Sequence, residues 1–538
     1  MSTPAPPVVL PDPKPPVPRG RGASAMLWAL AIAVTLPGAA PIAYLLWSVL
    51  RPGGFDAGGI GVGRLVDLAA STAVLVIAVT VTAVALGTTT AWLTTRTDLR
   101  GRGLWSTLVT LPLVIPSYVG ALAMLGSSGN AGVISLALDA VGLPKLGVFS
   151  GFWAAWGALS LWNFSYVHLI ATPALRRMDP GLEDAARGLG ASGRRVLIDV
   201  VLPQLRPALA SSSLLVGLYV ISDFGAVSLL RYETFTRAIY TQFRGRLDVT
   251  PALFLSGVLV LIALVLVVAE QRNRGRASLA ARRPTRPPRT VSLTGGARLA
   301  AYGFLTSVVV AALVLPLVTL GWWAGRGVSL GNVFAPVWAE AARSTSVSLT
   351  AAVVTVLAAI PIAILTVRHP SRPAQILESI SWSTYSLPHL AVGLGFLVLS
   401  IRFVPAVYQT VVVLVVAYVA MFLPQALAST QAGLRQVGVS LEDASRSLGS
   451  GALATLRRIT LPLVWPSMLA GGALVFLTVM KELPATLLLR PTGFETLAVR
   501  IWSASSDLFY TQASVSALVL IGISAVPLYL LVTRDLHR

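Results

Sequence analysis

Long runs of apolar residues, each bounded by short polar or glycine- and proline-rich segments, dominate the chain from about residue 26 onward. A helix needs about 20 mostly apolar residues to cross a bilayer. The stretches that meet this requirement lie at residues 26–50, 66–95, 104–126, 147–173, 208–230, 250–270, 300–325, 344–367, 376–401, 405–430, 467–490 and 511–533. The pattern therefore predicts an all-α polytopic membrane protein with about twelve transmembrane helices.

The first of these stretches is too long for the apolar region of a signal peptide, and the segment before it is proline-rich instead of short and basic. We therefore expect a retained membrane span. Residues 1–25 have the composition of a disordered, extended cytoplasmic tail. Composition supports the membrane assignment, because only 12% of the residues are charged, whereas soluble domains average about 25%.

The net charge of +20 is a feature that could suggest nucleic acid. A nucleic-acid-binding protein gathers its Lys and Arg into one patch or stripe, but here they lie in short clusters between apolar runs. The basic residues therefore indicate topology, and we expect contact with membrane lipid and no nucleic-acid partner. With the N-terminus inside, most of them fall in cytoplasmic loops, although residues 231–250 place four arginines outside. This predicts a multi-pass membrane protein with both termini cytoplasmic.

The densest arginine cluster lies within residues 272–298, which are also rich in Pro and Gly. Such a composition marks a connecting segment. We therefore divide the chain into a first transmembrane half at 26–270, a basic cytoplasmic linker at 271–299 and a second transmembrane half at 300–538.

The two halves repeat each other. Leu182–Gly190 reads LEDAARGLG and Leu441–Gly449 reads LEDASRSLG, at an offset of 259 residues. Earlier in each half a second offset, of 272 residues, matches Arg96 to Arg368 and Pro116 to Pro388. Because six spans is an even number, the two copies insert in the same direction, which predicts two parallel six-helix repeats.

The repeated stretch falls in the loop between the fourth and fifth spans of each half. Asp179 followed by Pro180 offers an N-cap and a first-turn proline, and Ser440 followed by Asp443 is a capping-box pattern. A glycine then ends each short helix, at position 190 or 449. A second basic helix is expected to stop at Pro203 or Pro462. The pattern predicts a helix–turn–helix on the inner face of the membrane.

This stretch resembles the EAA motif of type I ABC importer permeases, E-A-A-(3)-G-(9)-I-x-L-P. The spacing agrees in both copies, with Asp in place of the motif's Glu twice, Ser445 in place of Ala and Val200 in place of Ile. In that family the short helix docks into a cleft of the ATP-binding subunit. The resemblance implies ATPase-coupling roles for Glu183, Asp184, Ala185, Ala186, Gly190, Leu202, Pro203, Glu442, Asp443, Ala444, Ser445, Gly449, Leu461 and Pro462.

The fifth span of each half carries a closer resemblance. Ser222–Thr236 and Lys481–Pro491 are similar to the fused two-half permeases of ferric-iron importers. The resemblance implies a location in the bacterial inner membrane, two copies of a cytoplasmic ATP-binding subunit and an extracytoplasmic solute-binding protein, with ferric iron as the solute. Permeases for thiamine, for phosphonates and for other small solutes share parts of these stretches, so those solutes stay open as alternatives.

The chain is not expected to be an enzyme. A P-loop requires Gly-(4)-Gly-Lys-Ser/Thr, and no lysine here is followed by Ser or Thr. ATP would therefore be bound by the partner subunit. Cysteine is absent and the four histidines are far apart, so no catalytic residue, no cofactor and no metal site is predicted.

Asp223, Lys481 and Glu482 fall inside predicted spans, where an ionised group costs at least a few kcal/mol unless it is paired or faces a wet cavity. Adjacent Lys481 and Glu482 cannot face each other on a helix. Our hypothesis is that Lys481 pairs with Asp223 across the interface between the halves, near an external gate; the alternative is a static pair that only fixes packing. Prolines in or near the spans should kink or break them: Pro112, Pro116, Pro388 and Pro484.

Two other classes of protein compete with this interpretation. A secondary transporter of the 6+6 type also has twelve spans, a basic central linker and a parallel repeat. It does not predict a paired docking motif between the fourth and fifth spans. A non-transport membrane scaffold would not need ionisable residues at equivalent points inside both halves.

Overall fold

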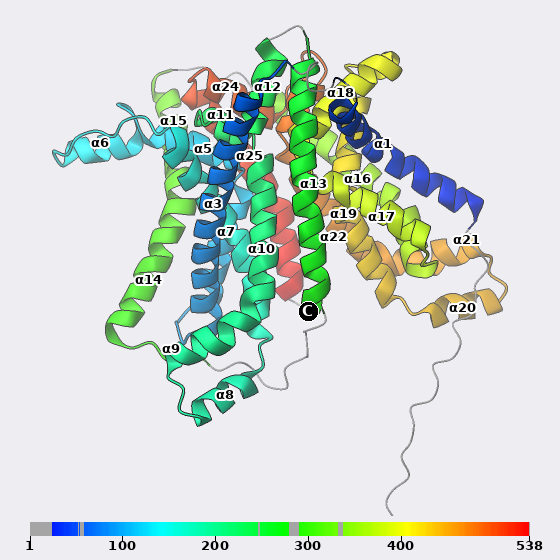
Figure 1. Ribbon diagram of the computed structural model, residues 1–538, viewed down its shortest axis with the longest axis horizontal. Helices are drawn as coiled ribbons and strands as arrows, with labels where there is room; N and C mark the ends of the chain where they lie inside the picture. Colours follow the sequence, from blue (N-terminus) through cyan, green and yellow to red (C-terminus); the bar gives the residue numbers. More distant parts are fainter. Residues whose placement is uncertain are drawn as a thin grey trace, which may run out of the picture.

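The computed structural model describes residues 24–51, 53, 59–245, 248–278, 290–331 and 337–536, and these residues are almost entirely helical. Within them, helices that are long and apolar enough to cross a membrane are α1 (Ala25–Leu50), α3 (Val62–Arg96), Gly193–Ser222, α13 (Thr250–Ser278), Gly295–Ser329, α16 (Trp338–Arg368), α19 (Val411–Gln436), Leu453–Met480 and α25 (Tyr510–Leu536). The all-α polytopic fold predicted from the sequence is confirmed (Figure 1).

Two further spans are broken helices. Arg102–Val114, which comprises α4 (Arg102–Thr110) and η1 (Leu111–Val114), meets α5 (Ser117–Ser127) at 93°. The corresponding pair in the second half, α17 (Arg372–Ser386) and α18 (His389–Phe403), meets at 109°. Pro116 and Pro388 are the N-caps of α5 and α18, and a proline has no N–H to continue a helix. With α7 (Gly151–Arg176), these elements occupy all twelve predicted stretches.

The fifth spans are also interrupted, contrary to the prediction from the sequence. Residues 208–230 and 467–490 were each expected to be one helix. Instead α10 (Leu202–Ser222) ends at Asp223, and α22 (Leu461–Met480) ends at Lys481. Short helices α11 (Gly225–Leu229) and α23 (Pro484–Leu489) follow. The acidic side chains cap these short helices, so the predicted charges lie at breaks between helices instead of within them.

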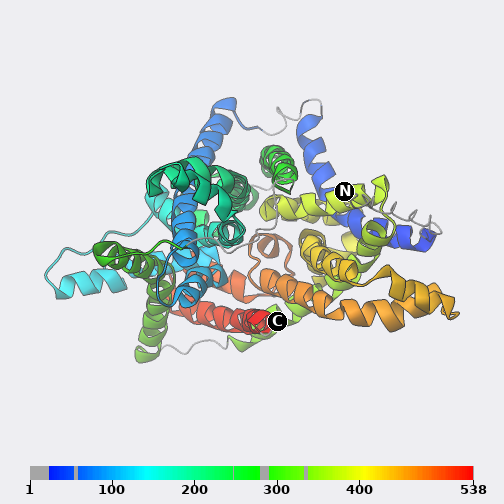
Figure 2. The same cartoon turned by 90° about the horizontal axis from the view of Figure 1, so that it is seen from below.

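The first helix of each half packs against the other half. Helix α1 packs on α16, α17, α18 and α19, and α14 (Gly295–Val309) and α15 (Leu315–Ser329) pack on α4 and α5 (Figure 2). Glycines permit this approach: a Cβ on Gly395 would lie 2.9 Å from the Cβ of Pro41. Trp323 on α15 donates from Nε1 to the carbonyl of Gly126, at 2.8 Å. The halves are therefore interlocked.

The helix–turn–helix is present in both halves. Its first helix is α8 (Pro180–Gly188) or α20 (Val439–Ser447), which we call the coupling helices. Glycines 190 and 449 follow them with φ of 84° and 88°, the left-handed conformation that glycine adopts freely. Asp179 is the N-cap of α8, as predicted, and accepts from the N–H of Gly181 at 2.9 Å. The capping box predicted at Ser440 is wrong, because Gly438 is the N-cap of α20.

The second helix of each motif does not stop at its proline, contrary to the prediction. It begins with α9 (Gly193–Val196) or α21 (Ala452–Thr455) and continues through a π-helical turn into the fifth span. These turns are η2 (Leu197–Val201) and η5 (Leu456–Thr460). Each ends just before the Leu-Pro pair, and its altered hydrogen-bond register accommodates the proline's missing N–H. We call the continuous helices Gly193–Ser222 and Leu453–Met480 the lever helices.

The end of the predicted linker attaches to the first half. The N–H of Val291 donates to the carbonyl of Arg96 at 2.7 Å. The Asp98 carboxylate accepts from the N–H of Leu293 at 2.9 Å and from Arg298 at 3.0 Å. Of the predicted linker, 271–278 belong to α13 and 279–289 lie outside the described residues, as does most of the predicted tail 1–25. The domain boundaries therefore remain a prediction.

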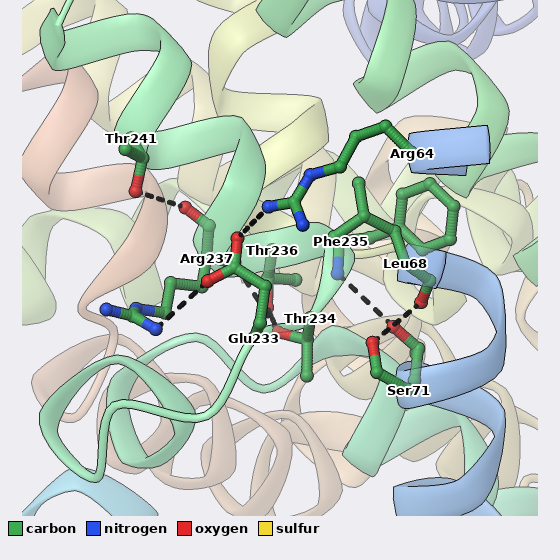
Figure 3. Close-up of polar contacts among 10 residues, drawn as sticks. Arg64, Leu68, Ser71, Glu233, Thr234, Phe235, Thr236, Arg237 and Thr241 are labelled. Carbon is green, nitrogen blue, oxygen red and sulfur yellow. Dashed lines mark hydrogen bonds and ion pairs between the residues drawn. The ribbon is translucent and has the colours of Figure 1, made fainter. Parts of the chain in front are cut away.

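Two further helices, α12 (Phe235–Gly245) and α24 (Leu497–Ser506), lie at the end of the molecule opposite the coupling helices (Figure 1). The N–H of Phe235 donates to Thr72 Oγ1 at 3.3 Å, and the N–H of Leu497 donates to Ser344 Oγ at 2.8 Å. Thr72 and Ser344 are equivalent in the repeat. Glu233, just before α12, also pairs with Arg64 and Arg237 (Figure 3). The region after each fifth span is thus attached to α3 or α16.

Candidate translocation site and coupling loops

The four helix breaks of the two halves meet around one cavity. Its volume is about 290 Å³. The lining includes Pro116 and His389, which directly follows the equivalent proline Pro388. It also includes all three predicted pathway residues, Asp223, Lys481 and Glu482. Irregular backbone at membrane depth is tolerated where it is buried in protein or lines a cavity. The structure therefore brings the predicted pathway residues together around a space that a small solute could occupy.

In the first half, the Asp223 carboxylate joins two helix breaks. Oδ2 accepts a hydrogen bond from the Ser117 hydroxyl at 2.5 Å. Oδ1 accepts from the N–H groups of Ala226 and Val227, at 3.0 and 3.2 Å. Since Ser117 is the first residue of α5 and Ala226 lies in the first turn of α11, one side chain connects the end of α10 to both α5 and α11.

The second half repeats this arrangement with different side chains. Glu482 Oε2 accepts from His389 Nδ1 at 2.9 Å, and its Oε1 accepts from the N–H of Ala485 at 3.1 Å. His389 is the first residue of α18 and Ala485 lies in the first turn of α23. The offsets found in the sequence relate Ser117 to His389, and Asp223 to Glu482. The two acids therefore make equivalent contacts, which we call the acid contacts.

Lys481 does not pair with Asp223, and the hypothesis of a salt bridge between them is wrong for this conformation. The ammonium donates to the carbonyl of Leu113 at 3.2 Å, across the interface between the halves. Pro116, three residues after Leu113, has no N–H to offer that carbonyl. The acceptor is thus available because of the proline, while both oxygens of Asp223 are already used by its own half.

Hydroxyl and amide groups line the cavity beside the acids, with Tyr219 and Thr478 one helical turn before them on the lever helices and Tyr166 and Gln425 on α7 and α19. Tyr166 and Tyr219 stack with ring centroids 4.4 Å apart. At the equivalent place, Gln425 and Thr478 hydrogen-bond at 3.1 Å, and Gln425 also donates to the hydroxyl of Tyr385 at 3.2 Å. Both halves therefore contribute oxygen groups to the lining of the cavity.

Aromatic side chains cover the cavity on the side of α12 and α24. Phe224 lies 5.8 Å from Trp502, ring centroid to centroid, and Tyr240 lies 5.3 Å from Trp502 in a T-shaped contact. Leu483, the equivalent of Phe224, is fully buried beside them, 3.2 Å from where a Cβ on Gly225 would lie. Phe224 and Tyr240 come from one half, Trp502 and Leu483 from the other. These four residues, which we call the roof, close the cavity on the side away from the coupling helices.

A buried ion pair holds each coupling helix to its own half. Arg96, the last residue of α3, pairs with Glu183, and both side chains are fully buried. Arg368, the last residue of α16, pairs with Glu442 at 3.0 Å, and Thr460 donates to the same carboxylate oxygen at 3.0 Å. The sequence predicted that Glu183 and Glu442 take part in coupling. The structure places them beneath the helices, where they position the loops and do not face outward.

Other predicted coupling residues lie on the surface. The side chains of Asp184 and Asp443 are 56% and 58% exposed. Ala185, Gly190, Leu202, Ala444, Gly449 and Pro462 are exposed, Ala186, Pro203 and Leu461 are half-buried, and Ser445 is buried. Leu189 and Leu448, which were not predicted from the sequence, are 89% and 88% exposed. The two coupling loops therefore expose apolar side chains at equivalent positions and to an equal degree.

Sequence reasoning also missed Ser117, His389, Arg96 and Arg368 as functional positions. For the arginines the sequence did carry a signal: the repeat matches Arg96 to Arg368, just as it matches Glu183 to Glu442, the acids with which they pair. For Ser117 and His389 the residue types differ between the halves, so only their position after the breaking proline connects them.

Comparisons with known proteins agree with this geometry. The family model of the binding-protein-dependent transport system inner membrane component matches residues 83–269 and 355–534, once in each half. The Fe(3+)-transport system permease protein FbpB 2 of Haemophilus influenzae is 32% identical over 472 residues, which cover 87% of this chain and 90% of that protein.

Other relatives are more distant. The ferric transport system permease protein FbpB of Actinobacillus pleuropneumoniae is 26% identical over 70% of this chain and 58% of its own length. A putative 2-aminoethylphosphonate transport system permease protein, PhnV of Salmonella typhimurium, is 28% identical over 28% of this chain and 56% of its own length. From the two family matches and the extent of the first similarity, this chain belongs to the binding-protein-dependent transport system inner membrane components, as a fused permease with both halves in one polypeptide.

Proposed function

We propose that this chain forms the translocation pathway of an ATP-driven importer for ferric iron. In this proposal two copies of an ATP-binding subunit dock on α8 and α20 from the cytoplasm, and an extracytoplasmic binding protein delivers iron to the side of α12 and α24. Both termini are then cytoplasmic. Family membership favours this over a 6+6 secondary transporter, which has no binding-protein-dependent component.

The observation that carries the proposal is the continuity from each coupling loop to the cavity. Each coupling helix presents an exposed leucine and is followed by a lever helix, of 30 residues in the first half and 28 in the second. At about 1.5 Å per residue, such a helix is more than 40 Å long. The levers end next to Asp223 and Glu482. A displacement at the loops is thereby delivered to the cavity.

The proposed cycle follows from this arrangement. The halves diverge toward α8 and α20, and α12 and α24 lie at the opposite end (Figure 1). There Tyr240 of α12 contacts Trp502 of α24 within the roof. This conformation corresponds to a cavity turned toward the cytoplasm. Binding of ATP draws the two ATP-binding subunits together, brings the coupling helices closer and separates the roof. Hydrolysis restores the present state.

Ferric iron is favoured as the solute by two arguments. The relative named for Fe(3+) transport matches along most of the chain, whereas the phosphonate relative matches only 28% of it. The cavity also offers carboxylate and phenol oxygens, which suit hard cations. Because Asp223 and Glu482 are already hydrogen-bonded, they would interact weakly with a passing ion and leave it free to move on.

The solute is tested by reconstituting the chain in liposomes with its ATP-binding subunit and its binding protein. We expect ATP-dependent accumulation of radiolabelled ferric iron, with no competition from excess thiamine or 2-aminoethylphosphonate. If the binding protein loaded with one of those solutes stimulates ATP hydrolysis and the iron-loaded form does not, iron is the wrong solute and the importer class stands.

The orientation is tested by single-cysteine labelling, because the chain contains no natural cysteine. A cysteine at Leu189 should react with a membrane-impermeant maleimide only after the cell is made permeable. A cysteine at Leu508, which follows α24 and is 60% exposed, should react in intact spheroplasts. The reverse pattern would contradict cytoplasmic coupling loops.

A further inference from the structure

We propose that Ser117 and His389 transmit the movement of the lever helices to the roof, through the two acid contacts. This inference rests on the proposed function, because it assumes that ATP moves the coupling helices. It assigns a role to two residues outside the docking surface, on α5 and α18, which we call the gate helices.

The breaks in the third span of each half separate the gate helices from the segments before them. Helix α5 meets the preceding segment at 93°, and α18 meets α17 at 109°. At such a break the helical hydrogen-bond ladder is interrupted, so α4 and α17 cannot drive the gate helices by rigid rotation. Another connection is needed between the gate helices and the elements that carry the coupling motif.

The acid contacts provide that connection. Asp223 directly follows Ser222, the last residue of the first lever, and accepts a hydrogen bond from Ser117, the first residue of α5. Glu482 lies two residues after the end of the second lever and accepts a hydrogen bond from His389, the first residue of α18. Hydrogen bonds to an ionised carboxylate are roughly twice as strong as neutral ones. Each lever is therefore joined to its gate helix by a strong side-chain contact.

The same acids carry the roof residues with them. One oxygen of each acid caps α11 or α23, and Phe224 or Leu483 lies between the acid and that short helix. The short helices also pack tightly on the gate helices. A Cβ on Gly225 would lie 2.6 Å from the Cβ of Tyr118, and one on Gly393 would lie 3.1 Å from the Cα of Ala485. Gate helix, short helix and roof residue therefore move as one group.

The repeat argues against a contact that only fixes packing. The pair is Ser–Asp in one half and His–Glu in the other, yet the same connection between a lever and a gate helix is formed. Packing elsewhere in the cavity differs freely between the halves, for example Tyr166 and Tyr219 against Gln425 and Thr478. The two halves share the connection and not the side chains that make it.

The test uses distances between spin labels in the full complex with its ATP-binding subunits, in nanodiscs. An inner pair at Arg177→Cys and Gln436→Cys lies just before the coupling helices at equivalent, exposed positions. An outer pair is placed at Asn130→Cys, three residues beyond the end of α5, and at Phe403→Cys, the last residue of α18; both positions are exposed. A non-hydrolysable ATP analogue should shorten the inner distance and lengthen the outer one.

In the variant S117A/H389A, the inner distance should still shorten while the outer change is lost, and uptake should fall roughly tenfold or more, as expected for loss of charge-assisted contacts. The variant S117T/H389N keeps a hydroxyl and an amide N–H at the places of the Ser Oγ and His Nδ1 donors, and should restore the outer change. The matched control is S165A, which removes another buried hydroxyl bond, 2.7 Å to the carbonyl of Val109, and should leave both distances unaltered.

The inner and outer distances distinguish a failure of the proposed function from a failure of the transmission role. If the inner pair of the otherwise unaltered chain does not respond to nucleotide, the proposed coupling fails, and the inference fails with it. If the inner pair responds and the outer change persists in S117A/H389A, the importer function stands and the transmission role is wrong. The transmission role is also wrong if S117T/H389N is as impaired as the alanine variant.

Discussion

The two halves of the molecule are alike at the coupling loops and different at the cavity. At the loops, the same Arg–Glu pair supports each helix, and the leucines that protrude are exposed to 89% and 88%. At the cavity, Ser117, Tyr166 and Tyr219 in one half stand where His389, Gln425 and Thr478 stand in the other. Matched surfaces suit two identical partner subunits. A solute meets both halves at once, so the cavity needs no such symmetry.

The largest effect is expected where the halves are alike. Leu189→Asp and Leu448→Asp each place a charge on the proposed docking surface, and the loss of a residue that anchors such an interface costs about 2–4 kcal/mol. Each single change should weaken association with the ATP-binding subunit equally, and both together should abolish ATP-driven uptake. Co-purification and titration of the subunit measure this. The control is Leu330→Asp, because Leu330 is 67% exposed and lies outside the coupling loops. Strongly unequal effects of Leu189→Asp and Leu448→Asp would contradict the idea that the two surfaces are matched.

The supports of the coupling helices come next. Arg96→Ala leaves the buried Glu183 with only the longer contact to Arg187, at 3.6 Å, and loss of the main partner of a buried charge costs about 3–5 kcal/mol. Arg368→Ala should cost somewhat less, because Thr460 still donates to Glu442 at 3.0 Å. Thermal unfolding in detergent and protease sensitivity of the loops measure both. Arg195→Ala is the control, since its ion pair with Asp199 is largely exposed and should contribute under about 1 kcal/mol. Equal losses of stability in all three variants would contradict the claim that the buried ion pairs support the coupling helices.

A smaller effect is expected at Lys481, whose equivalent position in the first half is Ser222 and carries no charge. Lys481→Met removes one bond to the carbonyl of Leu113, which should reduce stability by about 1–2 kcal/mol and lower uptake moderately. Reversal of both charges, D223K/K481D, should be as inactive as either single reversal, because these residues do not pair. Recovery of uptake in the double variant would show that they pair at another stage of the cycle.

The smallest effect concerns the end of the linker, which attaches to the first half. The N–H of Leu293 above all, with Arg298 and Ser292, holds the pKa of Asp98 below its usual range. A lowered carboxyl pKa stabilises the folded contact above the unfolded pKa, and the contribution is lost as pH falls through the folded value. The protection of the amides at residues 290–298 against hydrogen exchange, corrected for the intrinsic exchange rate at each pH, should therefore fall as pH drops below the normal Asp range. Asp98→Asn should raise exchange at neutral pH and remove this dependence; an unchanged profile would contradict it.

The sequence predicted the helical fold, the repeat and the coupling motif because each leaves a pattern of apolar runs, prolines and matched positions. It failed where side chains end helices. Asp223 and Lys481 were placed inside continuous spans, since an apolar run does not reveal an acid that caps the next helix. Pro203 and Pro462 were expected to end helices, because sequence alone does not show that a π-helical turn accommodates them. The partners of Asp223, Lys481 and Glu482 depended on tertiary packing between segments more than 90 residues apart.

Replacement of one coupling helix tests the central claim most directly. Residues 180–190 or 439–449 are exchanged for Gly-Ser segments of equal length, and ATP-driven uptake is measured in liposomes with the ATP-binding subunit and the binding protein. Either replacement should abolish uptake and release the ATP-binding subunit from that half. Uptake that continues with one coupling helix missing would contradict the account.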